Sequence, residues 1–569
     1  MATTNEERLF IATAFDGGMQ RRSTKFFRNE SEVYFAKNTD FQYRVGGVSK
    51  ALGYTKKGAT INSGNIVLGC GALNTSGGTN KLLAFSGTDA YVWNSGTDAW
   101  DAQSRTFTAS QKFETALFLD QLFIVNGLTD APQNYTGAAW STTTNVTDMP
   151  KGKFIIEDKL RLYVFNIALL VGGNFPSRFW YCDLPKNNAI TWGFESGADL
   201  ATTASSGTIT SAGSLFETRN LKVGDPVFIT TDADIGEYYI KTINSETSIT
   251  LTENLTANDT NVSFWAGGNY EDVARDNSDV GMGMGKNSDK VLFFKRFSLH
   301  KWTKGNTDSD NTLIPVKGVP GTTSHRSIVN ARDWTFYFSD TGMWRFDGTS
   351  SQLMSNPIQE VIDGVTAANK LIVAGWVVNN RIVKMYVGNV SNADTGLSIT
   401  KCVICYDAFS NAWWTESYDD QINCTIKWTE SDERKNFIFS NDGEAFQSEK
   451  GNDYNGVAFP MEVETWFYFP LAPEVNVNYT RFLTFTEHGR EISCLYKLAY
   501  FSAEHGYRVD DEWRRLRPKS KSQWLQEWTV DSDSNRASGF AIKFLESSAT
   551  NARPVIERIA AFYTGGELI

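Results

Sequence analysis

The chain has 569 residues, with 54 Lys and Arg against 65 Asp and Glu, which gives a formal net charge of −11. Aromatic residues make up 13% of it, too many for a disordered or coiled-coil chain. No apolar run approaches the roughly 20 residues of a membrane-spanning helix, and the acidic start does not look like a signal peptide. We therefore expect several folded domains or one large β body with additions, no membrane span, and no affinity of the whole surface for nucleic acid.

Short alternating segments, broken by Gly, Asn, Asp and Ser, dominate the chain from about residue 65 and predict β-hairpins. Three hairpins share an aromatic residue, a serine and a polar turn, at Ser86, Ser339 and Ser440. The last two serines lie 440 − 339 = 101 residues apart, or two periods of about 50. The first two lie 339 − 86 = 253 residues apart, which fits no such period without an insertion.

An insertion is visible between them. Residues 196–272 are rich in Thr, Ser and Ala, poor in aromatics, and predict one compact β-barrel or sandwich. Removing these 77 residues leaves 253 − 77 = 176, or four periods of 44. A period of about 44–50 residues is typical of four-stranded propeller blades. The alternative is that aromatic hairpins simply recur, as they do in any large β protein.

The predicted fold is all-β: a β-propeller of about seven blades with an inserted small β-barrel or sandwich and a C-terminal β-sandwich. We expect the blades at 65–105, 112–145, 152–194, 279–318, 323–355, 370–416 and 422–452. The predicted domains are an N-terminal segment (1–64), the first blades (65–195), the insert (196–272), the remaining blades (273–455) and the sandwich (456–569). Helical periodicity is clear only at 357–370.

The sequence predicts no catalytic residue, no metal site and no cofactor. None of the four histidines has metal-ligand spacing: His300, His325, His488 and His505. Cys402 and Cys405 lie in an apolar strand-like run and predict buried thiols rather than a redox or zinc pair.

Two loop motifs are also incomplete. The glycine-rich run at 281–286 has the wrong spacing for a phosphate-binding loop and is interpreted as a blade-entry turn. The run at 531–535 alternates oxygen ligands but lacks the glycine and the closing glutamate of a calcium loop.

One basic cluster reverses the sign of this acidic chain: Arg514, Arg515, Arg517, Lys519 and Lys521. It is interpreted as a solvated strand and loop, as a contact for an acidic neighbouring subunit, or as a contact for nucleic-acid phosphate. We take it as the candidate subunit-contact patch. Two aromatic runs, Trp413–Trp414 and 466–469, are further candidates for contacts between subunits, although blade core is the simpler interpretation of the first.

The N-terminal region carries the most specific motifs. They are Phe15–Met19, Asn29–Glu32, Lys37–Phe41, Gly46–Lys50 and Gly53–Tyr54. In this order they resemble the opening of tail proteins of tailed bacteriophages. Arg178–Cys182 is similar to a recurring blade strand of those proteins, and the Val223–Val227 segment resembles small barrel modules of phage structural proteins.

The family that the chain resembles forms the tail nozzle of short-tailed phages, also called tail tubular protein B or the DNA-stabilisation hub. In architecture the resemblance covers nearly the whole chain. It implies a non-enzymatic virion protein in a homohexameric ring, located in the tail and assembled in the host cytoplasm. It further implies contacts with adaptor or portal-side proteins and tail fibres, and a channel for double-stranded DNA without sequence-specific binding.

Two rival functions stay open. The first is a glycan-binding or sialidase-like propeller with its ligand in the central funnel, since the serine turns resemble part of the Asp-box turns of sialidases. The second is a fibre adaptor or another virion protein outside the tail tube.

Overall fold

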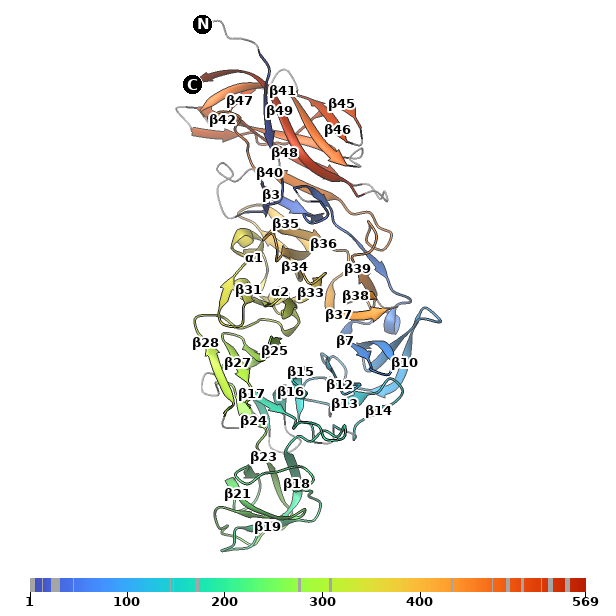
Figure 1. The fold of residues 1–569 in the computed structure, drawn as a ribbon, viewed down its shortest axis with the longest axis vertical. Helices are drawn as coiled ribbons and strands as arrows, with labels where there is room; N and C mark the ends of the chain where they lie inside the picture. The colour runs from blue at the N-terminus through green and yellow to red at the C-terminus, as the bar shows by residue number, and fades with distance from the viewer. Residues whose placement is uncertain are drawn as a thin grey trace.

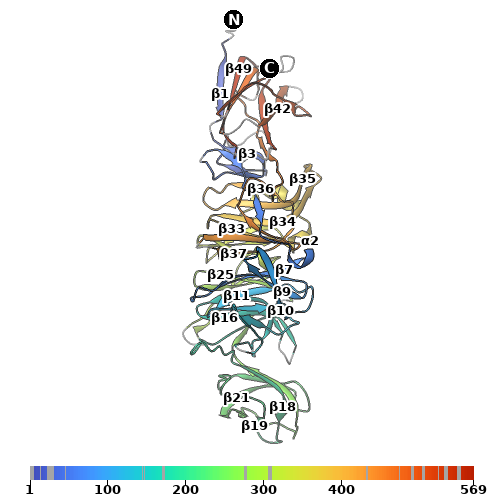
Figure 2. The same ribbon diagram turned by 90° about the vertical axis from the view of Figure 1, so that its right-hand side faces the viewer.

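The computed structural model describes residues 6–12, 14–21, 31–44, 46–143, 145–146, 148–168, 173–274, 278–305, 310–430, 433–472, 474–487, 492–502, 506–522, 524–530, 536–547 and 553–568. Their regular structure is almost all β-strand, as predicted. The molecule is elongated: a ring of blades occupies its middle, a small barrel lies at one end, and a sandwich with both chain termini lies at the other (Figure 1). Seen from the side, the three parts follow one line (Figure 2).

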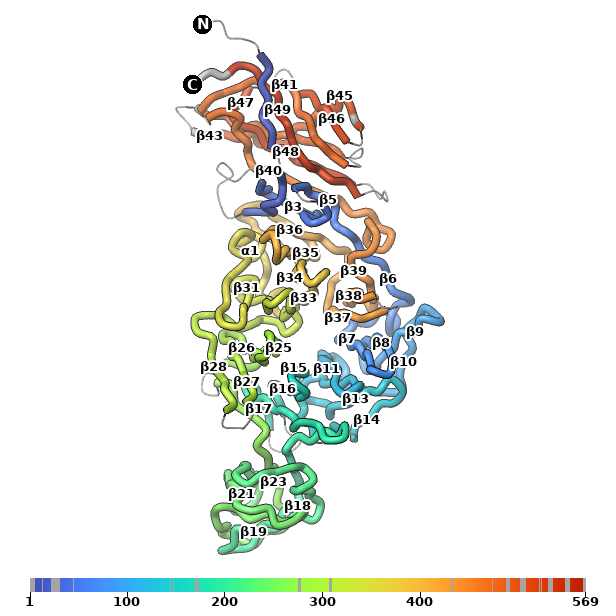
Figure 3. The backbone as a smooth tube through the Cα atoms, viewed as in Figure 1, coloured from blue at the N-terminus to red at the C-terminus, as the bar shows by residue number. Residues whose placement is uncertain are grey.

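The middle part is a β-propeller. Six separate four-stranded sheets form blades, and a seventh four-stranded unit belongs to a larger sheet. Their innermost strands neighbour one another in a closed ring around one axis (Figure 3). The blade strands are β7 (Val67–Asn74), β8 (Asn80–Ser86), β9 (Asp89–Asn94) and β10 (Ala99–Thr106); β11 (Glu114–Phe118), β12 (Gln121–Val125), β13 (Gln133–Tyr135) and β14 (Trp140–Ser141); β15 (Lys151–Asp158), β16 (Arg161–Ala168), β17 (Asn174–Tyr181) and β24 (Tyr270–Asp272); β25 (Gly281–Asn287), β26 (Lys290–Lys295), β27 (Leu299–Thr303) and β28 (Thr312–Val316); β29 (Val329–Ala331), β30 (Trp334–Ser339), β31 (Gly342–Phe346) and β32 (Ser351–Leu353); β33 (Ala374–Val378), β34 (Ile382–Asn392), β35 (Leu397–Asp407) and β36 (Trp413–Ser417); and β37 (Ile422–Glu430), β38 (Glu433–Ser440), β39 (Ala445–Ser448) and β6 (Tyr54–Lys56).

The last blade is completed from the other end of the chain. Its outer strand, β6, precedes the first blade in sequence and pairs antiparallel with β39, with Thr55 opposite Gln447. The N-terminal segment therefore closes the ring, which removes a free edge from this blade.

The repeated serines share one position in their blades. Ser86, Ser339 and Ser440 each end the second strand of a blade, and all three are fully buried. The Ser440 hydroxyl accepts hydrogen bonds from the backbone N–H groups of Asp442 and Glu444, which fixes the turn into the third strand. The Ser339 hydroxyl likewise accepts from the Thr341 N–H, whereas the Ser86 hydroxyl donates to the carbonyls of Asn65 and Ile66.

The insert is a closed barrel of β18 (Phe194–Ala201), β19 (Thr208–Ser211), β20 (Pro226–Ile229), β21 (Gly236–Ser245), β22 (Ser248–Leu251) and β23 (Val262–Gly267). It enters the propeller inside the third blade, between β17 and β24. Residues 270–272, which the composition placed in the insert, form the outer strand of that blade. Composition could not separate them because a three-residue strand carries too little signal.

The C-terminal part is built from two sheets that face one another. One sheet contains β4 (Thr39–Asp40), β5 (Val48–Lys50), β49 (Val555–Leu568), β41 (Val475–Glu487), β46 (Leu525–Thr529) and β45 (Arg517–Lys521), with β1 (Arg8–Ala12) and β47 (Arg536–Ala537) beside them. The other contains β40 (Met461–Thr465), β48 (Gly539–Glu546), β42 (Ser493–Ser502), β43 (Gly506–Val509) and β44 (Arg514–Arg515). Between the sheets, the rings of Tyr479 and Phe482 pack against Phe540, as the inner faces of a sandwich require.

The second sheet is continuous with the propeller. Strand β3 (Glu32–Lys37), flanked by β2 (Gly18–Met19), lies between β36 of the merged blade and β40 of the sandwich, so these strands form one eleven-stranded sheet. One hydrophobic core consequently runs from the fifth and sixth blades into the sandwich.

Helical structure is limited, as the sequence predicts. It consists of 3-10 turns η1 (Ile61–Gly64), η4 (His325–Ser327) and η5 (Asn356–Ile358) and of short helices α1 (Gln359–Asp363) and α2 (Ala367–Lys370). Predicted apolar positions such as Val361 and Ile362 are buried, and α1 ends at Gly364. Among the described residues, no helix is long and apolar enough to cross a membrane.

Candidate functional site

The predicted basic cluster lies at the edge of the sandwich and is divided between its two sheets. Arg514 and Arg515 form β44, whereas Arg517, Lys519 and Lys521 lie on β45, the edge strand of the other sheet. The buried side chain of Leu516 separates them, and the chain passes from one sheet to the other at this residue. The cluster therefore follows an exposed strand edge rather than forming a pocket.

Part of this charge is neutralised within the chain. A guanidinium nitrogen of Arg514 lies 3.2 Å from Asp510 Oδ1, and Lys519 Nζ lies 3.1 Å from Glu527 Oε1. Arg515 is exposed and has no carboxylate within ion-pair distance in the described part of the chain. The edge thus keeps a positive character, but a weaker one than five adjacent basic residues would give.

The axis of the propeller carries a second, unpredicted group of charges. Arg326, in η4, reaches across the ring and contacts three other blades. It donates to Glu114 Oε1 at 3.2 Å and to the backbone carbonyls of Leu68, Phe113 and Asn423. A single guanidinium therefore joins blades on opposite sides of the ring, across the axis.

His325 completes this group. Its Nδ1 accepts a hydrogen bond from the Met284 N–H at 3.2 Å, and its Nε2 lies 3.4 Å from Glu114 Oε2. Burial opposes the charge of Glu114, but His325 and Arg326 outweigh it and lower the pKa of this carboxyl to about 2. Glu114 therefore stays ionised as the counterion of Arg326 and is not available as a general acid near neutral pH.

Arg326 and Glu114 lie between two cavities at the axis of the propeller, which we call the two mouths of its channel. A cavity of about 530 Å³ on one side is lined by Lys112, Lys153, Phe154 and Thr323 among others. A wider cavity of about 710 Å³ on the other side is lined by strands of six blades, and Arg326 and Glu114 border both cavities. The sequence did not predict the group of Glu114, His325 and Arg326. Ring closure brings together residues that are about 200 positions apart, and no local motif marks them.

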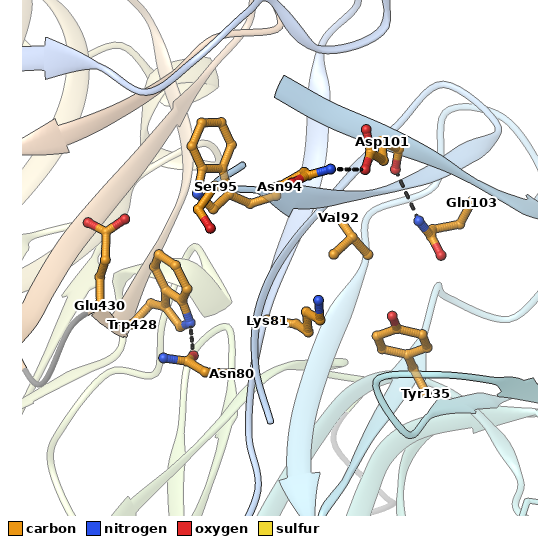
Figure 4. A pocket seen from close by; sticks show the side chains of 11 residues that line it. Asn80, Lys81, Val92, Asn94, Ser95, Asp101, Gln103, Tyr135, Trp428 and Glu430 are labelled. Carbon is orange, nitrogen blue, oxygen red and sulfur yellow. Dashed lines mark hydrogen bonds between the residues drawn. The ribbon is translucent and has the colours of Figure 1, made fainter. Parts of the chain in front are cut away.

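A third pocket, of about 440 Å³, lies where the outer strands of the first blade meet the second and last blades. Lys81, Asp101, Gln103 and Tyr135 surround Val92 in Figure 4, and Asn94 donates to Asp101 at 2.8 Å. Trp428 lines its other end, beside Asn80. The pocket is polar and has no arrangement of nucleophile and base.

The other predicted motifs are structural where the structure describes them. The run at 281–286 is strand β25, not a turn, and its glycines allow close packing at the axis: a Cβ at Gly283 would meet the Cα of His325 at 3.1 Å. Cys402 and Cys405 are buried free thiols on β35. His300 is buried, whereas His488, His505 and residues 531–535 lie outside the described residues.

The aromatic runs do not face other subunits. Trp413, Trp414, Trp466 and Tyr468 are all less than 5% exposed, and they fill the merged sheet and the base of the sandwich. The blade-core interpretation of Trp413 and Trp414 is therefore confirmed, whereas an intersubunit role for the buried side chains of Trp466 and Tyr468 is wrong. No group of three or more His, Cys, Asp or Glu side chains that could hold a metal ion occurs among the described residues.

Comparisons with known proteins give little beyond this geometry. No family model matches the chain, and no curated protein matches it. A solved structure of selenomethionine-substituted virginiamycin B lyase from Staphylococcus aureus is similar, with a TM-score of 0.34 and 9% sequence identity, over 69% of this chain and 98% of that one.

Proposed function

We propose that this chain is a structural, non-enzymatic virion protein: one subunit of the ring-shaped tail nozzle of a short-tailed bacteriophage. In this proposal several copies, six by the resemblance, surround a channel for double-stranded DNA, help to retain the genome, and dock adaptor proteins and fibres. The ring would be part of the tail of the virion, assembled in the host cytoplasm.

The observation that carries the proposal is the position of the N-terminal motifs. Several of the described N-terminal motif residues lie at the seam between propeller and sandwich, whereas Asn29 and Glu30 lie outside the described residues. Phe15 is fully buried, and Gly18 has φ of +69° with Trp413 N only 2.5 Å from where its Cβ would be. Lys50 is 1% exposed and pairs with Glu546 at 2.9 Å. These motif residues therefore have a shared structural reason to occur together, namely a rigid joint between two domains.

The shape of the molecule supports the same proposal. The barrel and the sandwich lie at opposite ends of the propeller (Figures 1 and 2). Arg326 and Glu114 occupy the axis of the propeller, so a DNA channel would have to form between copies rather than through one of them. An elongated subunit with different ends suits a ring of parallel copies with one end facing the capsid side.

The test is the state of the purified full-length chain and of particles without it. We expect closed rings in negative-stain images and a mass of several subunits by mass photometry. Particles lacking the protein should lose packaged DNA. A chain that stays monomeric at virion-like local concentrations would overturn the proposal, and loss of fibres alone would support the fibre adaptor instead.

The basic edge gives a second test of docking. Because Arg515 is exposed without an internal carboxylate, Arg515→Glu should weaken assembly with the neighbouring tail part, whereas Lys241→Glu, on the barrel, should not. Normal incorporation of the Arg515→Glu protein into particles would remove this edge as a docking surface.

A further inference from the structure

The channel of the propeller is cationic, although the chain as a whole is acidic. The residues that line its two mouths include six cations and one carboxylate, Glu114. The cations are Lys112, Lys153, Lys286, Arg326, Lys427 and Arg434. In a chain with 65 acidic and 54 basic residues, this local excess is opposite in sign to the net charge. The channel therefore favours an anion over a neutral ligand.

Two of these cations lie side by side at the wide mouth without a counterion. Lys427 on β37 is opposite Asn436 on β38, and Arg434 is opposite Thr429, so all four side chains share one face of the last blade. Neither Lys427 nor Arg434 has a carboxylate within ion-pair distance in the described part of the chain. By contrast, Lys286 lies 3.4 Å from Glu157, and Arg326 pairs with Glu114. The two unpaired cations are the natural point for a ligand's negative charge.

The surroundings of these two cations disfavour positive charge and leave a nearby donor unpaired. Partial burial, with Arg434 as the neighbouring charge, lowers the pKa of Lys427. The indole N–H of Trp376, which lines the same cavity and is 4% exposed, has no hydrogen-bond partner in the described structure. A buried donor without an acceptor is uncommon in folded proteins, and this one lies within the wall of the cavity.

The remaining wall indicates what kind of anion fits. The Asn330 carbonyl oxygen accepts from Thr335, Asn436 donates to the Val377 carbonyl and Thr425 donates to the Gly375 carbonyl. This leaves the Asn330 NH2 group to donate and the Asn436 carbonyl oxygen and Thr425 hydroxyl oxygen to accept, which suits the hydroxyl groups of a sugar ring. Val377 and Ile426 offer aliphatic surface for its C–H face. The volume of about 710 Å³ is in the range of sites for drug-sized ligands, whereas a free phosphate would leave most of it unfilled.

We propose that the wide mouth of the propeller channel binds an acidic saccharide, with the carboxylate of the sugar held between Lys427 and Arg434. The amides and Thr425 would hydrogen-bond its hydroxyls, and Arg326 with Glu114 would form the floor of the site. This binding activity is separate from the nozzle role, because it needs one propeller and no ring.

The probe is trigalacturonate, with maltotriose as the neutral trisaccharide of equal length, titrated calorimetrically into the full-length protein. We expect trigalacturonate to bind, more weakly as salt rises, and maltotriose to bind at least tenfold more weakly. Lys427→Gln and Arg434→Gln should each reduce the affinity about 10- to 100-fold, since each removes one charge-assisted contact. Lys241→Gln, an exposed lysine of the barrel, is the matched control and should bind as wild type.

The proposal has clear contrary outcomes. Equal affinity for both trisaccharides, or wild-type affinity in both channel variants, would overturn it. Binding of tripolyphosphate but not of trigalacturonate would show a phosphate site instead. Thermal unfolding of each variant confirms that it is folded, and ring formation in the same samples separates failure here from failure of the nozzle proposal.

Discussion

The two ends of the molecule are attached to the propeller in different ways. The sandwich shares a sheet and an apolar core with the propeller, through β3 between β36 and β40. The barrel has a core of its own and joins the third blade through a narrow neck. The neck combines polar and apolar contacts. Arg219 pairs with Asp148, and Asp183 accepts hydrogen bonds from Asn220 at 2.9 Å and Asn269 at 3.1 Å. Phe194 and Trp265 of the barrel pack against Trp180 of the blade.

The two kinds of attachment predict different unfolding behaviour for the sandwich and the barrel. An apolar seam that includes a continuous backbone ladder makes propeller and sandwich one cooperative unit, because neither can expose its half of the core to water. The neck couples its two sides less strongly, because the barrel shares no sheet with the blade, most of its apolar residues lie in a core of its own, and the polar groups of the neck can exchange their partners for water. We therefore expect the barrel to behave as a separable module and the sandwich not to.

Removal of one attachment at a time should produce the largest contrast. Deleting residues 1–57 removes β3 and the ring-closing β6, so we expect insoluble protein or a loss of cooperative unfolding. Joining Gly193 directly to Gly268 by a short turn removes the barrel, and it is feasible because Phe194 and Gly267 are paired neighbours at its base. Circular dichroism and calorimetry should show a folded protein after the second deletion.

The second deletion needs one repair to be a fair control. Trp265 of the barrel packs against Trp180 of the blade, with ring centroids 6.3 Å apart, so the shortened chain should also carry a polar residue beside this contact. A soluble, cooperative protein without residues 1–57 would show that the seam is not the joint we describe.

A single buried ion pair in the seam should give the next largest effect. Lys50 and Glu546 are each 1% exposed, and their charged atoms lie 2.9 Å apart. Lys50→Met leaves a carboxylate buried without its cation and should cost about 3–5 kcal/mol in the free energy of unfolding. Chemical denaturation measures it. The double variant Lys50→Met with Glu546→Leu should recover most of the loss, and an equal loss in both proteins would contradict a specific role for the pair.

An ion pair within the third blade, at the base of the neck, should cost less and act locally. Arg178 forms two hydrogen bonds with Asp272, at 2.9 and 2.8 Å, and its guanidinium lies 3.8 Å from the Tyr270 ring centroid. Arg178→Ala should lose about 2 kcal/mol. Hydrogen exchange should quicken in β24 and β23 but not in β41. Arg178→Lys keeps the positive charge but loses one of the two hydrogen bonds. If neither variant changes the free energy of unfolding or hydrogen exchange, this contact does not stabilise the base of the neck.

The sequence predicted the propeller because its blades repeat, and each repeat leaves a local mark. Ser86, Ser339 and Ser440 could be recognised without knowing what surrounds them, since each ends the second strand of its blade. The insert was visible for a similar reason: its composition differs. By contrast, β6 and β3 belong to partners hundreds of residues away, and a three-residue strand such as β24 has no periodicity to detect.

The candidate sites show the same limit. The basic cluster was found because its residues are adjacent in sequence, yet adjacency hid the fact that Leu516 divides it between two sheets. Arg326 and Glu114 could not be paired from the sequence, because their contact depends on closing a ring of seven inner strands. Lys427 and Arg434 needed the register of β37 and β38 to become neighbours.

The smallest predicted effect concerns a titrating group near the seam. Lys384 lies 2.8 Å from Glu416 and also pairs with Glu449 at 2.6 Å, so one buried cation serves two carboxylates. Burial, opposed by Lys384, raises the pKa of Glu449 to about 7. A carboxyl whose pKa is higher in the folded than in the unfolded protein binds its proton more tightly when folded. Its ionisation therefore destabilises the fold as pH rises from about 4.5 to about 7.

Glu449→Gln isolates this effect. We expect wild type to lose on the order of 1 kcal/mol of stability relative to the variant between pH 5 and pH 8, because the variant has no carboxyl to ionise beside Glu416. Denaturant midpoints at both pH values measure the difference, which cancels the titration of all other groups. The barrel-deleted protein should show the same difference, since Glu449 lies on the seam side of the propeller. A difference that vanished with the barrel would instead place the pH-sensitive joint at the neck, where burial raises the pKa of Asp148 to about 6.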